Sequence, residues 1–234
     1  MPGFRAFSPQ RFSENRGGIA APFRRSFNLY RRRPDAGREE PMRRALLVID
    51  MLNDFMDPAG ALYCGDEARR IIPVVKALIT RFVAENQPVI YLRDAHAEDD
   101  REFKLFARHA VKDSWGSRII PELQPTAEAL VVDKARFSGF YGNRLAEILE
   151  AARTEEVWIS GVCTSICVMD TAGDSRNRDY AVVIPVDAVA DFDPQAHEMA
   201  LKRMLRVYGA KLATARELLG GEAPSAPSST KGYT

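Results

Sequence analysis

Two cysteines of this chain lie in one short loop where a thiol could act as a nucleophile. Cys163 and Cys167 fall within residues 161–168, which read Gly-Val-Cys-Thr-Ser-Ile-Cys-Val and follow the apolar run 157–160. A thiol in the first turn of a helix is close to the positive end of the helix dipole, which favours the thiolate. The free N–H groups of such a turn can stabilise a developing oxyanion. The competing interpretation is that both cysteines are small buried apolar side chains, the more common role of a free cysteine.

Three further reactive side chains come at the ends of apolar runs. Asp50, Asp94 and Lys134 each follow a stretch rich in Val, Ile and Leu. Because ligands bind at the carboxyl ends of the strands in open parallel sheets, we expect these three residues and the cysteine loop to converge. A carboxylate held there between apolar walls would have a raised pKa and could accept and return a proton. Asp54 is the competing base, but we interpret it as a residue that holds its loop by hydrogen bonds.

The pattern of apolar residues predicts the elements that position these side chains. Helical spacing of apolar residues predicts helices over residues 71–82, 145–149, 164–178 and 199–207. Continuous apolar runs, typical of parallel strands covered on both faces, predict strands at 45–49, 88–92, 129–132, 157–160 and 180–186, with a short edge strand at 211–213. Alternating strands and helices predict a single-domain α/β fold: a Rossmann-like three-layer sandwich with a mostly parallel sheet of five or six strands.

The composition excludes several classes of protein. The chain has 234 residues, of which 46% are hydrophobic and 28% charged, as in a globular domain. We expect no membrane partner, since no apolar run approaches the ~20 residues that cross a bilayer. Three cysteines do not suggest a disulfide framework, so we expect a reducing, cytoplasmic setting.

The two ends of the chain differ in composition from the rest. Residues 1–41 are rich in Arg, Gly, Ser and Pro without periodic apolar residues, so we predict a disordered N-terminal extension. It could be dispensable, an organellar targeting segment or an interaction arm. Residues 42–220 form the predicted domain, and 221–234 a flexible tail. Nine Arg and four acidic residues lie in the first forty positions, so the folded part is slightly acidic and we expect no nucleic-acid partner.

Three segments resemble the isochorismatase-like cysteine hydrolases. Residues 161–168 resemble that family's loop of glycine, valine, alanine, threonine, two variable residues, cysteine and valine. Residues 47–55, Leu-Val-Ile-Asp-Met-Leu-Asn-Asp-Phe, resemble its opening signature, and residues 132–140, Val-Asp-Lys-Ala-Arg-Phe-Ser-Gly-Phe, resemble its lysine segment. The motifs occur in the family's order and at about its spacing, over roughly residues 44–219.

This resemblance implies a role for each motif residue. Cys167 aligns with the family's nucleophile, Asp50 with its general base, and Lys134 with the lysine that stabilises thiolate and anionic intermediate. The resemblance also implies a cis peptide bond between Val162 and Cys163. The backbone amides of Cys163 and Cys167 would form the oxyanion hole, with Cys163 in a position usually held by alanine.

A metal site is implied by a further, partial resemblance to nicotinamidases. Asp94, His96 and His109 match in type and order the ligands of one divalent ion (Zn, Mn or Fe), and Glu102 matches an extra carboxylate of some members. The chain departs from the pattern, because Ala95 stands where nicotinamidases have Trp, residues 106–110 lack their Trp-Pro, and the interval between the histidines is short. The alternative is that both histidines simply hydrogen-bond in a charged lid loop.

The expected reaction is hydrolysis of a small carboxamide, with nicotinamide as the leading substrate, through a Cys167 thioester. The alternatives are another amide or carbamoyl compound, isochorismatase-type vinyl-ether hydrolysis, which needs no thiol, and a non-catalytic binding module. We expect Phe55 and Phe140 to contact the substrate and no organic cofactor to be needed. Cys64 matches no motif and is interpreted as incidental, and His197 as structural. We also expect a homo-oligomer, either a dimer or a tetramer.

Overall fold

The computed structural model describes residues 42–126 and 129–221 of the chain. The extension predicted to be disordered, residues 1–41, lies outside the described residues. The predicted flexible tail lies outside them too, apart from Gly221. No helix within the described ranges is long and apolar enough to cross a bilayer.

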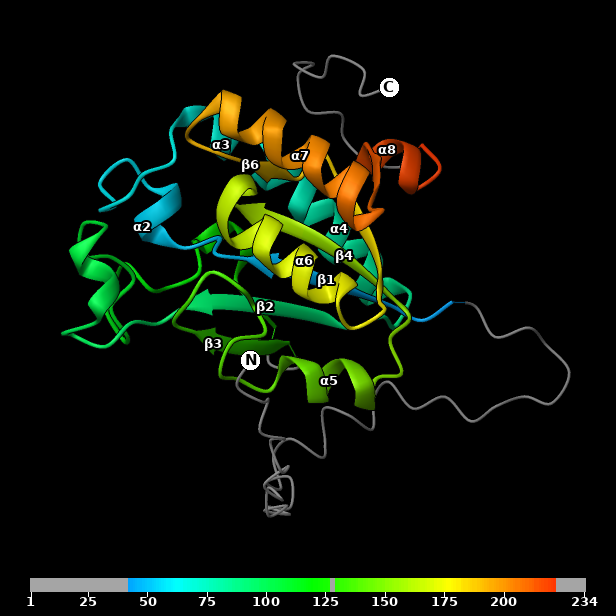
Figure 1. The fold of residues 1–234 in the computed structure, drawn as a ribbon, viewed down its shortest axis with the longest axis horizontal. Coiled ribbons are helices and arrows are strands. Elements are labelled where there is room, and N and C mark those ends of the chain that lie inside the picture. Colours follow the sequence, from blue (N-terminus) through cyan, green and yellow to red (C-terminus); the bar gives the residue numbers. More distant parts are fainter. Residues whose placement is uncertain (1–41, 127–128, 222–234) are drawn as a thin grey trace, which may run out of the picture.

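A parallel sheet forms the centre of the molecule (Figure 1). Its strands are β1 (Arg44–Ile49), β2 (Val89–Asp94), β3 (Leu130–Lys134), β4 (Glu156–Val162), β5 (Ala181–Pro185), β6 (Val189–Ala190) and β7 (Lys211–Ala213). Their order is β3-β2-β1-β4-β5-β7, with β6 paired to the end of β4, and all these pairings are parallel. The predicted mostly parallel α/β sheet is confirmed. The sheet of the described residues has seven strands, one more than the five or six predicted. The additional strand is β6, which has only two residues, too few to give a pattern of its own.

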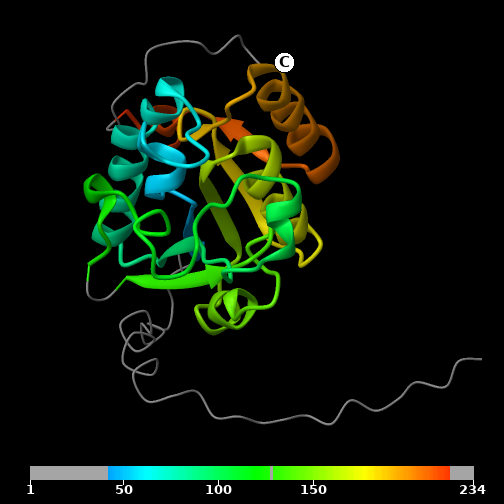
Figure 2. The same ribbon diagram turned by 90° about the vertical axis from the view of Figure 1, so that its left-hand side faces the viewer.

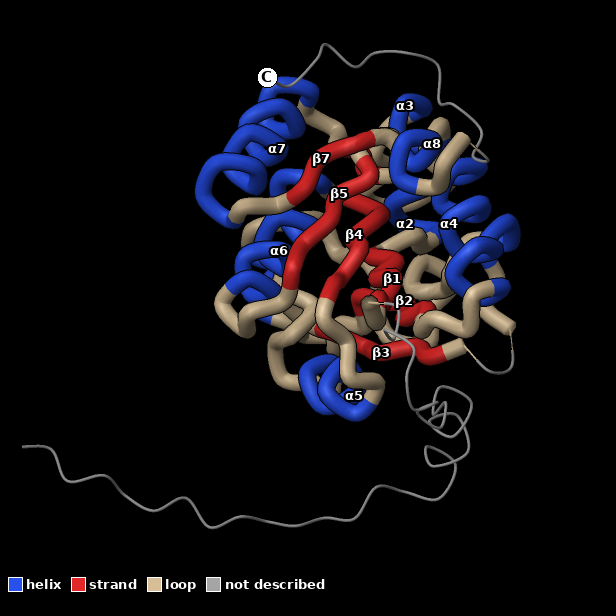
Figure 3. The backbone as a smooth tube through the Cα atoms, turned by 90° about the vertical axis from the view of Figure 1, so that its right-hand side faces the viewer, coloured by secondary structure: helices blue, strands red, loops and turns tan. Residues whose placement is uncertain are grey.

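Helices cover both faces of the sheet, as predicted (Figure 3). The described α-helices are α2 (Asn53–Met56), α3 (Asp66–Arg69), α4 (Ile72–Ala84), α5 (Leu145–Ala151), α6 (Met169–Arg176), α7 (Pro194–Tyr208) and α8 (Ala215–Leu218). Short 3-10 turns lie at Arg101–Lys104 and Pro121–Leu123, and a wide π-helical turn, η3 (Thr164–Val168), leads into α6. Helices α4 and α8 pack on one face, whereas α5, α6 and α7 pack on the other.

The central strand β1 shows why the strand sequences lack an apolar–polar alternation. Leu46 and Val48 pack into the core beneath α4, whereas Leu47 and Ile49 pack into the core beneath α5–α7. All four side chains are buried because both faces of the sheet are covered. The continuous apolar runs that predicted the strands are the direct consequence of this layering.

The carboxyl ends of β1, β2, β3 and β4 meet at one edge of the sheet. Figure 2 looks onto this edge, around which residues 50–65 and 95–111 lie as long connections. Long connections between regular elements are a common place for binding and catalytic residues. This edge holds the predicted site.

Candidate active site

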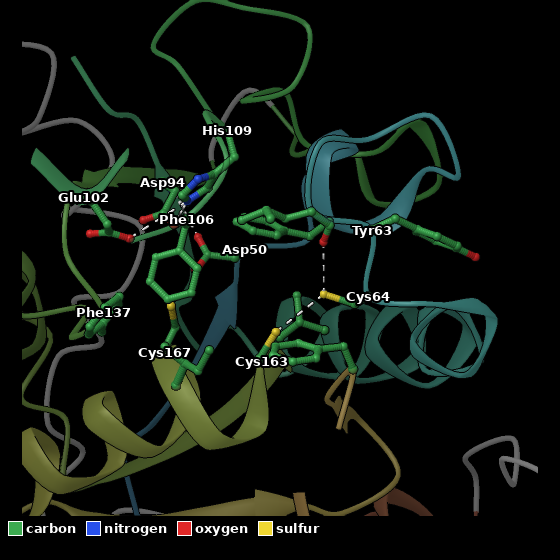
Figure 4. A pocket seen from close by; sticks show the side chains of 15 residues that line it. Asp50, Tyr63, Cys64, Asp94, Glu102, Phe106, His109, Phe137, Cys163 and Cys167 are labelled. Atoms are coloured by element: carbon green, nitrogen blue, oxygen red, sulfur yellow. Dashed lines mark hydrogen bonds and ion pairs between the residues drawn. The ribbon is translucent and has the colours of Figure 1, made fainter. Parts of the chain in front are cut away.

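Asp50, Lys134 and Cys167 lie together at the carboxyl edge of the sheet. Figure 4 shows Asp50 and Cys167 at the cavity beside them. Asp50 directly follows β1, Lys134 is the last residue of β3, and Cys167 lies in the π-helical turn after β4. The Lys134 Nζ atom is 2.7 Å from Asp50 Oδ2 and 3.4 Å from Cys167 Sγ. The ammonium group also lies 2.6 Å from Asp94 Oδ1 at the end of β2 and donates to Arg136 O at 3.3 Å. The structure therefore brings the three predicted catalytic residues together.

The backbone around Asp50 fixes its carboxylate. Asp50 has a positive φ of 51°, so the chain turns sharply as it leaves β1. Its amide donates to Leu92 O on β2 at 2.9 Å, and its Oδ1 accepts from the Asp94 amide at 2.9 Å. Lys134 Nζ is close to Oδ2 but not aligned for a hydrogen bond, so Oδ2 has no hydrogen-bond donor among the described residues. This oxygen remains free to accept a proton.

Gly161 allows β1 and β4 to approach each other beneath the nucleophile loop. Its φ is 111°, a value that residues with a side chain rarely adopt. A Cβ atom at this position would lie 1.9 Å from Ile49 O. Only glycine therefore fits here, directly before the Val162–Cys163 peptide bond, which is cis as expected.

Two contacts hold the nucleophile loop from outside the sheet. The Ser165 amide donates to Asp191 Oδ2 at 2.7 Å, and His197 Nδ1 lies 2.9 Å from Thr164 Oγ1. Thr164 is fully buried, so this histidine supports the loop from α7 rather than facing the pocket. The interpretation of His197 as a structural residue is confirmed.

The charges of the cluster depend on each other. Burial disfavours the charged form of Lys134, but the adjacent Asp50 and Asp94 together hold the pKa of Lys134 well above its ordinary value. Burial also acts to raise the pKa of Asp94, but the adjacent Lys134 and the nearby His96 outweigh it, so this pKa is lowered. The ammonium and the Asp94 carboxylate therefore form a charged pair at neutral pH.

Asp50 and Cys167 differ from this charged pair, because the pKa of each is raised and its neutral form is favoured. Burial, followed by the negative charge of Asp94, raises the pKa of Asp50 to about 6. Burial also raises the pKa of the Cys167 thiol, and the nearby carboxylates add to this effect although Lys134 opposes it. Burial therefore outweighs the effect of the helix start, which was expected to favour the thiolate, and Cys167 is a thiol in the resting site. The predicted rise in the pKa of Asp50 is confirmed, and this residue is placed to take the thiol proton during attack.

Asp54, the competing base, is engaged elsewhere. Its Oδ1 accepts from the Ala61 amide at 3.1 Å, and its Oδ2 accepts from the Ala110 amide at 2.7 Å. Gly116 packs so closely on this carboxylate that a Cβ there would overlap it. The interpretation of Asp54 as a residue that holds loops is confirmed.

The four residues proposed as metal ligands also lie together. Nε2 of His96 is 3.6 Å from Asp94 Oδ2 and 3.9 Å from Glu102 Oε1. Nε2 of His109 is 4.0 Å from the same Asp94 oxygen and 3.9 Å from the same Glu102 oxygen. A tetrahedral shell with bonds of about 2.1 Å places its donor atoms about 3.4 Å apart. The four distances given above exceed this separation by only a few tenths of an ångström.

The contacts of the two histidine Nδ1 atoms, which face away from the proposed ion, suit metal binding. His96 Nδ1 lies 3.2 Å from Asp100 Oδ2, and His109 Nδ1 lies 2.8 Å from Ala107 O. Acceptors at Nδ1 place the proton there and leave the Nε2 lone pair free for an ion. His96 Nε2 is buried without a hydrogen-bond partner among the described residues, which is costly unless something else occupies it. The residues therefore fit a divalent cation, and Asp94, His96 and His109 form a potential metal-binding group.

Backbone pairing explains how His96 and His109 come together although few residues separate them in the sequence. The His96 amide donates to Ala110 O at 3.0 Å, and the Lys112 amide donates to His96 O at 2.9 Å. Residues 96 and 111 thus form a parallel bridge that places His109 beside His96, with ring centroids 4.8 Å apart. The departures from the nicotinamidase pattern do not disrupt the cluster.

A cavity of about 260 Å³ opens beside Cys167 and His109. Phe55 lines it and packs against His109 with ring centroids 5.5 Å apart. Phe140, the other expected substrate contact, does not line it. The Gly139 amide donates to Thr171 Oγ1 on α6, and this bond turns Phe140 into the core, where Arg178 lies 4.4 Å from its ring centroid.

Sequence reasoning assigned no substrate contact to several side chains that line the cavity. They are Leu62, Tyr63, Cys64, Phe106, Phe137, Ile166 and Phe192. Cys64 is therefore not incidental: it forms part of the wall, 3.4 Å from Cys163 Sγ. Phe137 and Ile166 lie inside the lysine and cysteine motifs, so their positions offered a signal. The others come from loops without a regular pattern.

Comparison with known proteins agrees with this architecture. The family model of the isochorismatase domain matches residues 44–217, which include every residue of the site described above. The chain belongs to the isochorismatase family. Members of this family are hydrolases that act on small molecules. The resemblance carried by the three sequence motifs is therefore confirmed.

Three solved structures illustrate how this isochorismatase-family chain relates to amidases. N-carbamoylsarcosine amidase from Thermoplasma acidophilum is 36% identical with a TM-score of 0.68, covering 74% of this chain and 97% of its own. Nicotinamidase PncA from Bacillus subtilis is 34% identical with a TM-score of 0.70, covering 74% and 99%. Pyrazinamidase of Pyrococcus horikoshii, in complex with zinc, is 33% identical with a TM-score of 0.69, covering 73% and 98%.

Proposed function

We propose that this chain is an amidohydrolase that cleaves the C–N bond of a small neutral carboxamide through a thioester on Cys167. The observation that carries this proposal is the position of Lys134 Nζ, 2.7 Å from Asp50 Oδ2 and 3.4 Å from Cys167 Sγ, directly behind two residues that line the cavity. A nucleophile, a base and a fixed positive charge in contact are the groups that acyl transfer requires.

The first half of the reaction forms the thioester. The Cys167 thiol passes its proton to Asp50 as the sulfur attacks the carboxamide carbon. The amides of Cys163 and Cys167 receive the developing oxyanion, and Lys134 stabilises the negative charge nearby. Asp50 then returns the proton to the leaving nitrogen, so that the C–N bond breaks and ammonia departs.

The second half returns the enzyme to its starting state. Water gives a proton to Asp50 and attacks the thioester carbon, and the C–S bond breaks. The carboxylic acid leaves, and Cys167 recovers its proton from Asp50. A divalent ion held by Asp94, His96, His109 and Glu102 would supply a Lewis acid that binds a ring nitrogen or a water beside the substrate.

The walls of the cavity favour a neutral, flat substrate. Drug-sized ligands occupy pockets of about 300–1,000 Å³, so a cavity of about 260 Å³ suits a smaller molecule. Phe55, Phe106 and Phe137 supply aromatic surface. None of its lining residues in the described part of the chain is Arg or Lys, whereas Asp50, Asp94 and Glu102 are acidic. A substrate carboxylate would meet these acidic side chains and no Arg or Lys among the lining residues, which favours nicotinamide over isochorismate or N-carbamoylsarcosine.

Ammonia release tests this proposal directly. The purified protein is incubated with nicotinamide, benzamide and N-carbamoylsarcosine, with and without added zinc, and ammonia is measured. We expect turnover of nicotinamide, at least a thousandfold loss in Cys167→Ala and Lys134→Ala, and little change in Lys202→Ala, an exposed lysine of α7. Turnover that survives in Cys167→Ala would contradict the thioester route. Binding of nicotinamide without any ammonia would favour the alternative of a non-catalytic module.

The proposed chemistry also bears on where the protein works. Cys167 must be a free thiol, and the three cysteines in the structure are free, so we propose a reducing compartment such as the cytoplasm. Cell fractionation tests this. The expected homo-oligomer stays a prediction, which light scattering of the purified protein can measure.

A further inference from the structure

Cys64 and Cys163 form a close pair of thiols that the proposed reaction does not use. Cys64 lies in the connection between α2 and α3, and Cys163 follows β4, yet their sulfur atoms are 3.4 Å apart (Figure 4). Both side chains line the catalytic cavity and are nearly buried, with 4% and 8% exposure. A small reagent that enters the cavity can therefore reach them.

We propose that Cys64 and Cys163 are an oxidative modification site: a peroxide joins them in a disulfide that distorts the nucleophile loop. The pair is separated by 99 positions in the sequence, so the bond would tie the loop before α3 to the carboxyl end of β4. Cys167 is not the favoured partner, because its sulfur already accepts a hydrogen bond from Lys134 Nζ at 3.4 Å.

The chemistry requires two steps and one molecule of hydrogen peroxide. In the first step the Cys64 sulfur attacks a peroxide oxygen, the O–O bond breaks, and the displaced hydroxide takes the thiol proton to form water. This leaves Cys64 as a sulfenic acid. In the second step the Cys163 sulfur attacks the Cys64 sulfur, the S–O bond breaks, and the second hydroxide leaves as water with the Cys163 proton. The two sulfurs together lose two electrons, which the peroxide gains.

The order of these steps follows from the environment of Cys163. Its hydrogen bond with Cys64 and its burial raise the pKa of Cys163, so this thiol stays protonated and reacts second. Cys64, whose sulfur also lies 3.6 Å from Leu62 O in the same loop, is the first to be oxidised. A slow first step is expected, since a nearly buried thiol is a poor nucleophile.

The consequence for the catalytic loop follows from distance. A disulfide has an S–S length of about 2.05 Å, so the two sulfurs must approach by about 1.4 Å from their present separation of 3.4 Å. The Cys163 amide belongs to the proposed oxyanion hole, and a misplacement of about 1 Å at a reacting centre can cost about a hundredfold in rate. We therefore expect the oxidised protein to lose at least tenfold in amidase activity, and reduction with dithiothreitol to restore it.

Peptide mass spectrometry tests the linkage independently of any activity. The full-length protein is treated with hydrogen peroxide, alkylated and digested with trypsin without reduction. Cys64 lies in the tryptic peptide 45–69, whereas Cys163 and Cys167 share the peptide 154–176. We expect a species that joins the two peptides, with fragmentation between residues 163 and 167 placing the bond at Cys163. The Cys167→Ala variant should form the same species, because the nucleophile takes no part.

The variants give each outcome a clear meaning. Cys64→Ser and Cys64→Ala should both abolish the linked species, and Cys163→Ala should do the same. Absence of the link in the wild-type protein, at a peroxide dose that already oxidises Cys167, overturns the proposal. A bond that fragmentation assigns to Cys167 overturns it as well. If the link forms but the protein releases no ammonia from any amide, the modification site stands and the proposed hydrolase function fails.

Discussion

Replacing Lys134 with methionine gives the strongest test of the charged cluster at the sheet edge. The substitution keeps the volume of the side chain but removes a buried ammonium that lies 2.7 Å from Asp50 and 2.6 Å from Asp94. At an effective dielectric of about 20, each contact contributes on the order of 6 kcal/mol, and desolvation of the ions offsets most of this sum. Losing one partner of a buried ionic network typically costs about 3–5 kcal/mol. We expect Lys134→Met to lower the free energy of unfolding by this amount at pH 7.

The pH dependence of this loss identifies its cause. Without Lys134, the folded-state pKa values of the two carboxylates rise above their unfolded values, since burial then acts unopposed. Groups with raised folded pKa values contribute stability that is present at low pH and lost as pH rises. The gap between the variant and the wild type should therefore shrink as pH falls from 7 towards 4.

Urea unfolding followed by the fluorescence of the two tryptophans measures both quantities, with chelator present to keep metal out of the comparison. Lys202→Met is the matched control: this exposed residue pairs with Glu198 at 3.4 Å along α7, and its loss should cost less than about 0.5 kcal/mol. If Lys134→Met lowers the free energy of unfolding by less than about 1 kcal/mol relative to the wild type, the assignment of a buried, ionised network is refuted. A gap that does not vary with pH refutes it as well.

Three other substitutions test different parts of the site. Gly161→Ala places a Cβ 1.9 Å from Ile49 O at a φ of 111° and should cost more than about 3 kcal/mol by urea unfolding, against roughly 1 kcal/mol for Gly142→Ala, which has open space around it. His109→Ala should lower bound zinc from about one ion per chain to none in elemental analysis after dialysis; an unchanged zinc content would exclude the proposed ligand set. Burial lowers the pKa of His197 below 6.5 in the folded state, so the wild type should lose stability as pH falls below 6.5, and His197→Gln should remove that part of the dependence. Parallel stability curves for the two proteins between pH 7 and 5 would contradict it.

The fold and the catalytic residues were predictable because both depend on continuous local patterns. Strand β1 is buried on both faces, so its whole sequence is apolar and Asp50 marks its end. Lys134 similarly ends β3 and Cys167 follows β4, and a parallel sheet then brings strand ends together without further information. The strand β6 escaped prediction because two residues carry no periodicity.

The walls of the cavity were not predictable in the same way. Phe140 is the last residue of the lysine motif, yet a bond from Gly139 to Thr171 on α6 turns its ring into the core. Phe192 and Cys64 reach the cavity from loops whose path depends on tertiary contacts, such as the 2.9 Å bond from the Cys64 amide to Phe55 O. The sequence next to a strand predicts which residues lie at the end of that strand. It does not predict which way a side chain in a loop points.

Asp94 connects the two clusters at the sheet edge. Its Oδ1 contacts the Lys134 ammonium at 2.6 Å, and its Oδ2 lies 3.6 Å from His96 Nε2. With Lys134 protonated and both Asp50 and Asp94 ionised, the buried group carries one net negative charge, which contributes to the raised pKa of Asp50. A cation held at Oδ2 would offset that excess charge on the side away from the nucleophile. The metal cluster and the catalytic cluster are therefore electrostatically coupled through a single carboxylate, whose two oxygens face different partners.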